Sequence, residues 1–317
     1  MSANTVNTPP RIAVVGSLNM DLVLQVARAP EAGETVLADG LHLVPGGKGG
    51  NQAVACARQG AHVHLFGRLG DDGYGRTLRA GLAADGIDHS GVQTDTESTT
   101  GVAAITVEAT GQNRIVVVPG ANGRFVLDAL ALGAALPGAG GLVVQFETPM
   151  PQVVAAAQQA HAAGCPVVLN PSPIQPLPDT LWPLVHTLVV NEVEAAALAG
   201  VAVDTPEDAA AAAQALRGRG PAQVVVTLGA AGAVAADADG CRHHPGMRVR
   251  AVDTTAAGDT FLGALAVALA RGEPLDAGVR EGIRAAALCV TQHGAQPSIP
   301  TRAAVAQSPQ PPDWTAL

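Results

Sequence analysis

A run of small residues that ends in a carboxylate carries the clearest chemical signal in the chain. Residues 254–261 read Thr-Thr-Ala-Ala-Gly-Asp-Thr-Phe and lead into an apolar helical pattern. Backbone N–H groups at a helix start have no intrahelical acceptor, so those of Ala256, Ala257 and Gly258 can hold the charge of a transferring phosphoryl group. Asp259 can accept a proton from an attacking hydroxyl. Such an acid often only caps a helix, but the small residues before it favour catalysis.

A second signal is a glycine-rich loop around the only lysine. Residues 45–51 read Pro-Gly-Gly-Lys-Gly-Gly-Asn, and Lys48 is the one lysine among 18 basic residues. The glycines let backbone approach a ligand closely, and Asn51 opens a helix whose N-terminus favours anions or polar oxygens. The spacing excludes a Walker A loop, because Gly49 follows the lysine. Taken alone, a flexible loop with a solvated lysine explains the segment equally well.

Three further motifs directly follow apolar runs. Asn191 and Glu194 either cap the next helix or place an amide and a carboxylate at the ligand-binding end of a parallel strand, where a few oxygens can hold Mg²⁺. Residues 227–232 form a turn suited to a nucleotide, which is a weak signal by itself. Asn19 and Asp21 can bind sugar hydroxyls, although a simple turn is the plainer interpretation.

The elements that must position these groups alternate between strands and helices. Continuous apolar runs typical of strands buried on both faces occupy residues 12–15, 142–144, 167–169, 188–190 and 224–226. Helical patterns occupy residues 51–59, 74–84 and 206–216. The alternation predicts an α/β fold of the Rossmann-like type, with a mostly parallel sheet flanked by helices.

Inserted strands without a helix between them break this alternation. They are expected at residues 22–26, 35–44, 102–108 and 114–118, within segments 18–44 and 101–118. They predict a small β-sheet that covers one end of the domain. The whole domain is expected to span residues 11–304, with disordered tails at 1–10 and 305–317.

Composition excludes several classes of protein. Hydrophobic residues make up 48% of the 317 residues, and the net charge of −9 comes without a basic run, which argues against a nucleic-acid partner. No apolar stretch is long enough to span a membrane, and the polar N-terminus lacks a signal core, so we expect a cytoplasmic protein. The four cysteines form no C-x-x-C pair, which fits a reducing compartment and argues against zinc.

Taken together and in order, these motifs resemble the PfkB carbohydrate kinases. The loop 46–51, the Asn191-x-x-Glu194 pair and residues 255–261 carry the resemblance, and further matches extend it over roughly residues 11–304. The pattern is most similar to that of family members that phosphorylate ribose. The resemblance implies an ATP-dependent kinase that phosphorylates the 5-hydroxyl of D-ribose, with a β-lid that often pairs with a second lid in a homodimer.

The resemblance also implies a role for each site residue. Asp259 is expected to be the catalytic base, and the N–H groups of Ala256, Ala257 and Gly258 the anion hole. The sugar is expected to contact Asn19, Met20, Asp21, Gly47, Lys48, Gly49, Gly50, Asn51, Glu147 and Asp259. ATP is expected to contact Asn191, Thr227, Leu228, Gly229, Ala230, Ala231, Gly232, Gly258, Asp259 and Ile283.

Two cations follow from the resemblance as well. Glu194 is expected to act on Mg²⁺ through water. A monovalent cation, K⁺, is expected at Asp253, Thr255, Cys289, Gln292, Gly294 and Ser298, mostly through backbone carbonyls. Two alternatives stay open at this point: a kinase for another furanose or a nucleoside, such as deoxyribose, fructose or adenosine, and a non-catalytic sensor of sugar or nucleotide on the same fold.

Overall fold

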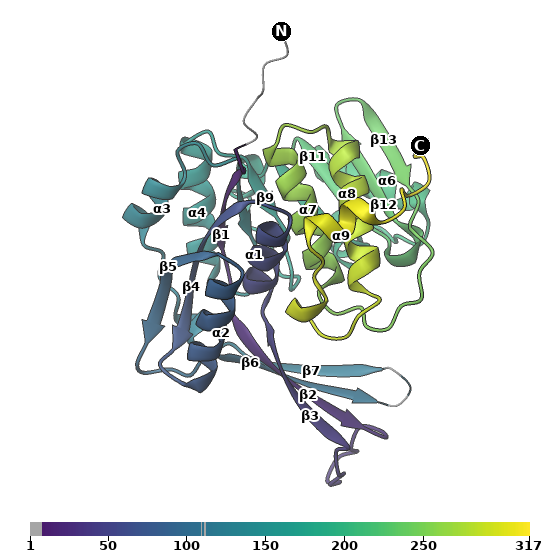
Figure 1. Ribbon diagram of the computed structural model, residues 1–317. Coiled ribbons are helices and arrows are strands. Elements are labelled where there is room, and N and C mark those ends of the chain that lie inside the picture. Colours follow the sequence, from purple (N-terminus) through teal and green to yellow (C-terminus); the bar gives the residue numbers. More distant parts are fainter. Residues whose placement is uncertain (1–7, 109, 111) are drawn as a thin grey trace.

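A ten-stranded sheet forms the body of the protein in the computed structural model, which describes residues 8–108, 110 and 112–317 (Figure 1). The strand order is β14-β13-β12-β11-β10-β9-β8-β1-β4-β5. The strands from β11 to β5 along this order are parallel to one another, and β12, β13 and β14 pair with their neighbours in antiparallel fashion. The predicted α/β class with a mostly parallel sheet is confirmed.

Five of the ten strands of this sheet lie at the apolar runs predicted for residues 12–15, 142–144, 167–169, 188–190 and 224–226. Their bounds are β1 Arg11–Val15, β4 His62–Gly70, β5 Asp88–Asp95, β8 Gly141–Val144, β9 Val167–Leu169, β10 Thr187–Asn191, β11 Gln223–Thr227, β12 Ala233–Asp237, β13 Gly240–His244 and β14 Thr315–Ala316. Side chains of β1 alternate between two cores, since Ile12 and Val14 join one cluster while Ala13 and Val15 join the other. Burial on both faces is why these runs are continuously apolar.

Helices cover both faces of the sheet. Their bounds are α1 Lys48–Arg58, α2 Gly73–Ala84, α3 Ala129–Ala135, α4 Met150–Ala162, α5 Glu192–Ala199, α6 Pro206–Arg217, α7 Ala257–Ala270, α8 Leu275–Cys289 and α9 Arg302–Gln307, with short 3₁₀ turns η1 Gly120–Arg124, η2 Trp182–Leu184, η3 Gly229–Ala231 and η4 Gln296–Ser298. Helices α1, α2, α7 and α8 pack on one face, and α3, α4, α5 and α6 on the other. Among the described residues, no helix has the length and apolar character needed to cross a membrane.

Helix α1 begins three residues earlier than the sequence pattern suggested, at Lys48. The glycines that were interpreted as loop are its first turn, because this turn packs against the end of β1. A Cβ on Gly49 would lie 2.5 Å from the backbone of Gly16, so no other residue type fits there without displacement. Gly47, at the cap, has a φ of 82°, in the left-handed region that favours glycine.

A small four-stranded sheet in the order β3-β2-β6-β7 projects from one end of the body (Figure 1). Its strands are β2 Asn19–Val26, β3 Gly40–Gly46, β6 Gly101–Glu108 and β7 Asn113–Val118. We call this sheet the lid. The strand predicted at 35–44 is shorter than expected, because β2 ends at Val26 and its pairing with β3 begins only at Gln25 and Gly40.

The C-terminal segment departs from the expectation of a disordered tail, which is wrong for this part of the chain. Helix α9 continues to Gln307, and β14 pairs with β13. The buried guanidinium of Arg284 donates to the carbonyls of Val305 and Ser308. These hydrogen bonds hold the backbone at the start of the predicted tail against α8. At the other end, residues 1–7 of the predicted N-terminal tail lie outside the described residues.

Candidate active site

The carboxyl ends of five parallel strands meet at one edge of the main sheet. Val15 pairs with Val144, which in turn pairs with Leu169. Further along the same edge, Asn191 is the direct register partner of Thr227. The polar motifs that follow these strands are therefore neighbours in space, at the end of an open α/β sheet where ligands bind.

Asp259 is buried at this edge and is held by two side-chain amides. Asn51 Nδ2 donates to its Oδ2 at 3.0 Å, and Gln52 Nε2 donates to its Oδ1 at 2.9 Å. Gln52 is fixed in turn by Gln145 Nε2, which donates to its Oε1 at 2.6 Å. Each oxygen of the Asp259 carboxylate therefore accepts a hydrogen bond from an amide, and the two bonds together fix its orientation. The sequence analysis missed Gln52 and Gln145, because nothing in their spacing distinguishes them from other buried polar residues.

The helix start beside Asp259 has the backbone expected of an anion site. Ala256 caps α7 with φ 60° and ψ 9°, and it is the only non-glycine residue with a positive φ in the described part of the chain. A β-carbon in this left-handed conformation is strained, and such strain is concentrated at functional sites. A Cβ added to Gly258 would have no heavy atom within 4 Å, so the space beside this first turn is open to a ligand.

Glu147 and the glycine-rich loop are joined by hydrogen bonds. Glu147 Oε2 accepts from Ser17 Oγ at 2.5 Å and from the Lys48 amide at 3.0 Å. Burial acts to lower the pKa of Lys48, but the carboxylates of Asp259, Glu147 and Glu194 outweigh it and raise the pKa. Lys48 is therefore a charged, half-buried cation among carboxylates, and the interpretation as a solvated loop lysine is wrong.

Asn19 and Asp21 come from the first residues of the lid strand β2. Asn122 Nδ2 donates to Asn19 Oδ1 at 2.8 Å and so fixes this side chain. Gly46 leaves room for Asp21, since a Cβ there would lie 2.1 Å from its carboxylate. Burial, followed by the charges of Glu147 and Asp259, raises the pKa of Asp21 to about 7.

Met20 lies between them in sequence but not in the site. Its side chain is 2% exposed and belongs to the same apolar cluster as Leu18. Successive side chains of a strand point to opposite faces, so Met20 points to the core while Asn19 and Asp21 do not. The expected sugar contact of Met20 is therefore not supported by its position.

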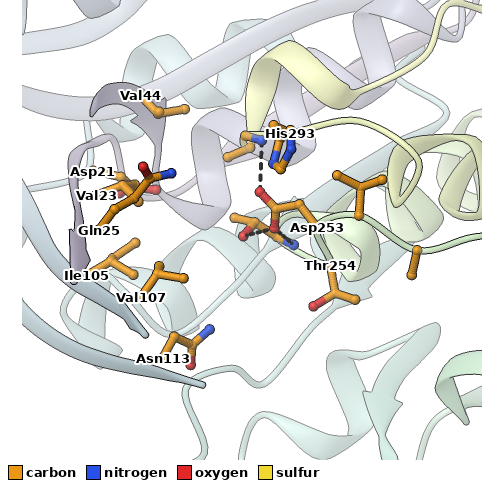
Figure 2. Close-up of a pocket in the computed structure, with 15 residues that line it drawn as sticks. Asp21, Val23, Gln25, Val44, Ile105, Val107, Asn113, Asp253, Thr254 and His293 are labelled. Carbon is orange, nitrogen blue, oxygen red and sulfur yellow. Dashed lines mark hydrogen bonds between the residues drawn. The ribbon is translucent and has the colours of Figure 1, made fainter. Parts of the chain in front are cut away.

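A cavity of about 330 Å³ lies between the lid and the loops before α7 and after α8 (Figure 2). Every second residue of β2 lines it, namely Asp21, Val23 and Gln25. Across the cavity, Figure 2 shows Asp253 and Thr254 from the main body. The alternation of the lid strands therefore directs one lid face, mixed polar and apolar, toward the loops before α7 and after α8.

The expected nucleotide side is built on β10 and β11. Asn191 Oδ1 accepts from the Glu194 amide at 2.8 Å, and Glu194 Oε2 accepts from the Asn191 amide at 3.0 Å. This reciprocal capping box confirms the capping interpretation and fixes both side chains at the sheet edge. Gly232, with φ 101°, closes the turn 227–232 against the carbonyl of His244, where a Cβ would lie 2.0 Å away. Ile283 on α8 is buried and belongs to the apolar cluster on one face of the sheet.

The expected monovalent-cation residues gather around one carboxylate. Asp253 Oδ1 accepts from the amide and the hydroxyl of Thr255, and its Oδ2 accepts from the Gly294 amide at 2.9 Å (Figure 2). Burial would raise the pKa of Asp253, but these hydrogen bonds hold it below its ordinary value. The carboxylate joins the loop before α7 to the loop after α8. Cys289 Sγ lies 3.0 Å from Ser298 Oγ, whereas Gln292 is exposed.

Hard oxygen ligands are what an alkali cation requires, and among the expected positions Asp253 offers the one carboxylate. A divalent metal would find fewer ligands in the protein itself. In the described residues, no group of three or more His, Cys, Asp or Glu could hold a metal ion. A site for Mg²⁺ would therefore draw most of its ligands from phosphate and water, with Glu194 as an outer partner.

Comparison with known proteins agrees with this geometry. The family model described as pfkB family carbohydrate kinase matches residues 9–302. The chain belongs to this family. Its members are kinases of carbohydrates, so the carboxylate at Asp259 and the helix start at Ala256 lie in a phosphotransferase that acts on a hydroxyl group.

Individual relatives give more detail. A ribokinase of Haemophilus influenzae is 40% identical over 292 residues, which cover 92% of this chain and 95% of that protein. A ribokinase of Bacillus subtilis is also 40% identical and covers 92% and 96%. The solved structure of Arabidopsis thaliana ribokinase complexed with ribose and ATP has a TM-score of 0.88 and 32% identity, covering 95% of this chain and 98% of that one.

The raised pKa of Asp21 predicts a pH-dependent stability. Since the folded protein binds this proton up to about pH 7 and an exposed aspartate loses it near 3.8, ionisation of Asp21 destabilises the fold progressively between these values and fully above them. Asp21→Asn should therefore raise the Tm by about 2–5 °C at pH 8 and change it little at pH 4. The measurement is calorimetry of both proteins at the two pH values, with the exposed Asp39→Asn as control. Equal shifts at both pH values would contradict the buried-charge argument.

Proposed function

We propose that this protein transfers the γ-phosphoryl group of ATP to the 5-hydroxyl of D-ribose and forms ribose 5-phosphate and ADP. The observation that carries the proposal is the Asp259 carboxylate, which is fixed by two amides next to the strained start of α7. The similarity to ribokinases, including one solved with ribose and ATP, supports ribose as the acceptor.

The acceptor end of the site is assigned to Asn19, Asp21 and Glu147, together with the loop around Lys48. These side chains offer amide and carboxylate groups at fixed positions, which suits a sugar with several hydroxyls. Asp259 takes the proton of the primary hydroxyl as its oxygen attacks the γ-phosphorus. The N–H groups at the start of α7, together with the Lys48 ammonium, stabilise the charge that develops on the phosphoryl oxygens.

The nucleotide end is assigned to Asn191, the turn 227–232 and Ile283. Asn191 and Thr227 are register partners, so the turn and the helix cap lie together at the edge of the sheet. Mg²⁺, bound with the phosphates and reached by Glu194 through water, would neutralise part of their charge.

The test is the acceptor specificity of ADP release from ATP and Mg²⁺ in K⁺ buffer. Ribose should be turned over faster than deoxyribose, fructose or adenosine, and phosphorus NMR should identify the product as the 5-phosphate. Asp259→Asn should lower turnover roughly 10²–10⁴-fold while ATP still binds. If another acceptor were turned over faster, that acceptor would replace ribose as the proposed substrate, and the role of Asp259 as the base would stand. Binding without turnover of any acceptor would favour the alternative of a non-catalytic sensor.

We also propose that K⁺ binds at the loop pair joined by Asp253. Exchange of K⁺ for Na⁺ at constant ionic strength should lower turnover severalfold, because the position of these loops sets the start of α7. In the Asp253→Asn variant, turnover in K⁺ and in Na⁺ should become nearly equal. In the control variant Asp313→Asn, at an exposed position, turnover should still be higher in K⁺. Turnover indifferent to the cation in the unaltered protein would contradict the site.

The outer face of the lid supports a homodimer. Four apolar side chains on this face are largely exposed: Leu41 (58%) and Leu43 (52%) of β3, and Val116 (67%) and Val118 (52%) of β7. Such a concentration of exposed apolar side chains is unusual on a surface that contacts only water. A second lid packed on this face would bury them. Leu43→Glu should then convert a dimer into a monomer in light scattering, and a monomeric unaltered protein would exclude the arrangement.

A further inference from the structure

The turn 227–232, which we call the nucleotide turn, rests against the end of β13. The His243 ring donates from Nε2 to the Ala231 carbonyl at 2.8 Å. The contact leaves no spare room, because a Cβ on Gly232 would lie 2.0 Å from the His244 carbonyl. The position of β13 therefore sets the position of the turn that is assigned to ATP.

The side chain of His244 joins β13 to α8. His244 is 1% exposed, and its Nε2 donates to Asp276 Oδ1 on α8 at 2.9 Å, since a carboxylate can only accept. The same oxygen accepts from Nε of the buried Arg242 at 2.7 Å, and the other two nitrogens of this guanidinium donate to Asp237. Charge-assisted hydrogen bonds are strong and directional, so β13 is firmly held on the side of α8.

The outer side of β13 is covered by residues 309–317, which we call the C-terminal segment. Its strand β14 is the last strand of the main sheet, and Figure 1 shows the C-terminus close to β13. Thr315 pairs with His243, and the Leu317 amide donates to the Cys241 carbonyl at 3.0 Å. The segment therefore lies beside the residue whose ring donates to the nucleotide turn.

Two further contacts hold the C-terminal segment. The Trp314 ring lies 6.5 Å from the His244 ring and is tilted by 47° to it, within the range of favourable aromatic pairs. Arg280 of α8 donates to the carbonyls of Pro311 and Pro312, each at 3.3 Å. The segment is thus fixed to both of the elements, β13 and α8, that Asp276 and His244 join.

We propose that the C-terminal segment is a positioning element of the nucleotide site, and that Trp314 and His244 are positioning residues within it. This inference rests on the proposed function, which assigns the nucleotide turn to ATP. With the segment docked, β13 is held by α8 on one side and by β14 on the other. With the segment undocked, β13 becomes an edge strand and the turn loses part of its support.

Sugar binding should not depend on this docking. None of the side chains assigned to the sugar comes from β13 or from the C-terminal segment. A change in docking should therefore alter the affinity for the nucleotide and leave the affinity for ribose unchanged, which a general loss of stability would not do.

The first experiment uses the unaltered protein and hydrogen exchange measured by mass spectrometry. If docking favours nucleotide binding, the nucleotide must favour docking by the same factor. Saturating ADP with Mg²⁺ should therefore slow amide exchange in residues 309–317 about fivefold. Residues 129–135 of α3, on the opposite face of the sheet, serve as the control and should exchange as before. Unchanged exchange in the C-terminal segment would overturn the proposal.

The second experiment separates the two substrates in variants. Thr315→Pro removes an N–H from the pairing of β14 and loses little packing, because Thr315 is exposed. It should weaken ADP binding in calorimetry and raise KM for ATP, each about fivefold, with kcat and KM for ribose nearly unchanged. The matched control Thr315→Ala keeps the N–H and should bind ADP like the unaltered protein.

The aromatic contact is tested in the same way. Trp314→Ser should also weaken ADP binding, because it removes the ring beside His244. Leu130→Ser, at an apolar position on α3 that is 88% exposed, should have no effect. An unchanged ADP affinity in Thr315→Pro and Trp314→Ser, or an equal rise of KM for ATP and ribose, would contradict the positioning role.

This inference and the proposed function fail in different ways. If the protein binds ADP and phosphorylates ribose, but ADP leaves exchange in the C-terminal segment unchanged, the inference is wrong and the function stands. If the unaltered protein binds no ADP, the proposed function is wrong and the inference falls with it.

Discussion

The hydrogen bonds from Asn51 and Gln52 to Asp259 are the interaction on which the site depends. They join the first turn of α1 to the first turn of α7 across about two-thirds of the chain. The two helices approach closely enough because Gly263 faces Ala55, where a Cβ on the glycine would lie 2.4 Å from that of the alanine. Packing of small residues behind the site therefore sets the position of the carboxylate in front of it.

The second constraint is electrostatic. Asp21 lies in a largely buried region, where the charges of Glu147 and Asp259 add to burial in raising its pKa. Lys48 is the only lysine in a chain of net charge −9, and it lies where these carboxylates converge. An anionic phosphoryl group can enter such a region only if cations and N–H groups offset the carboxylates. Lys48, whose pKa is raised, supplies such a cation, and the open start of α7 supplies N–H groups.

The sequence predicted the five central strands β1, β8, β9, β10 and β11, because runs such as 224–226 are apolar without interruption only when both faces are buried. It also predicted the capping of α5, since Asn191 carries a local signal that needs no tertiary context. Helix α1 was placed too late, because Gly49 and Gly50 signal a loop unless their packing against β1 is known.

Two kinds of error in the site have a tertiary origin. Gln52 and Gln145 were missed because their role exists only after α1, α7 and β8 meet. Met20 was included because it lies between the expected sugar contacts Asn19 and Asp21, although strand alternation turns its side chain into the core. The C-terminal tail was read as disordered from its prolines, yet Arg280 and Arg284 of α8 hold it through backbone carbonyls, which no proline pattern reveals.

The most direct measurement of the central claim is a double-mutant cycle between Gln52 and Asp259, followed by turnover of ribose. If Gln52 acts by orienting the base, Gln52→Leu should lower kcat in the unaltered protein and cause almost no further loss in the Asp259→Asn background. Equal losses in both backgrounds would mean that the two residues act independently, and would contradict the account of a carboxylate positioned by the amides of α1.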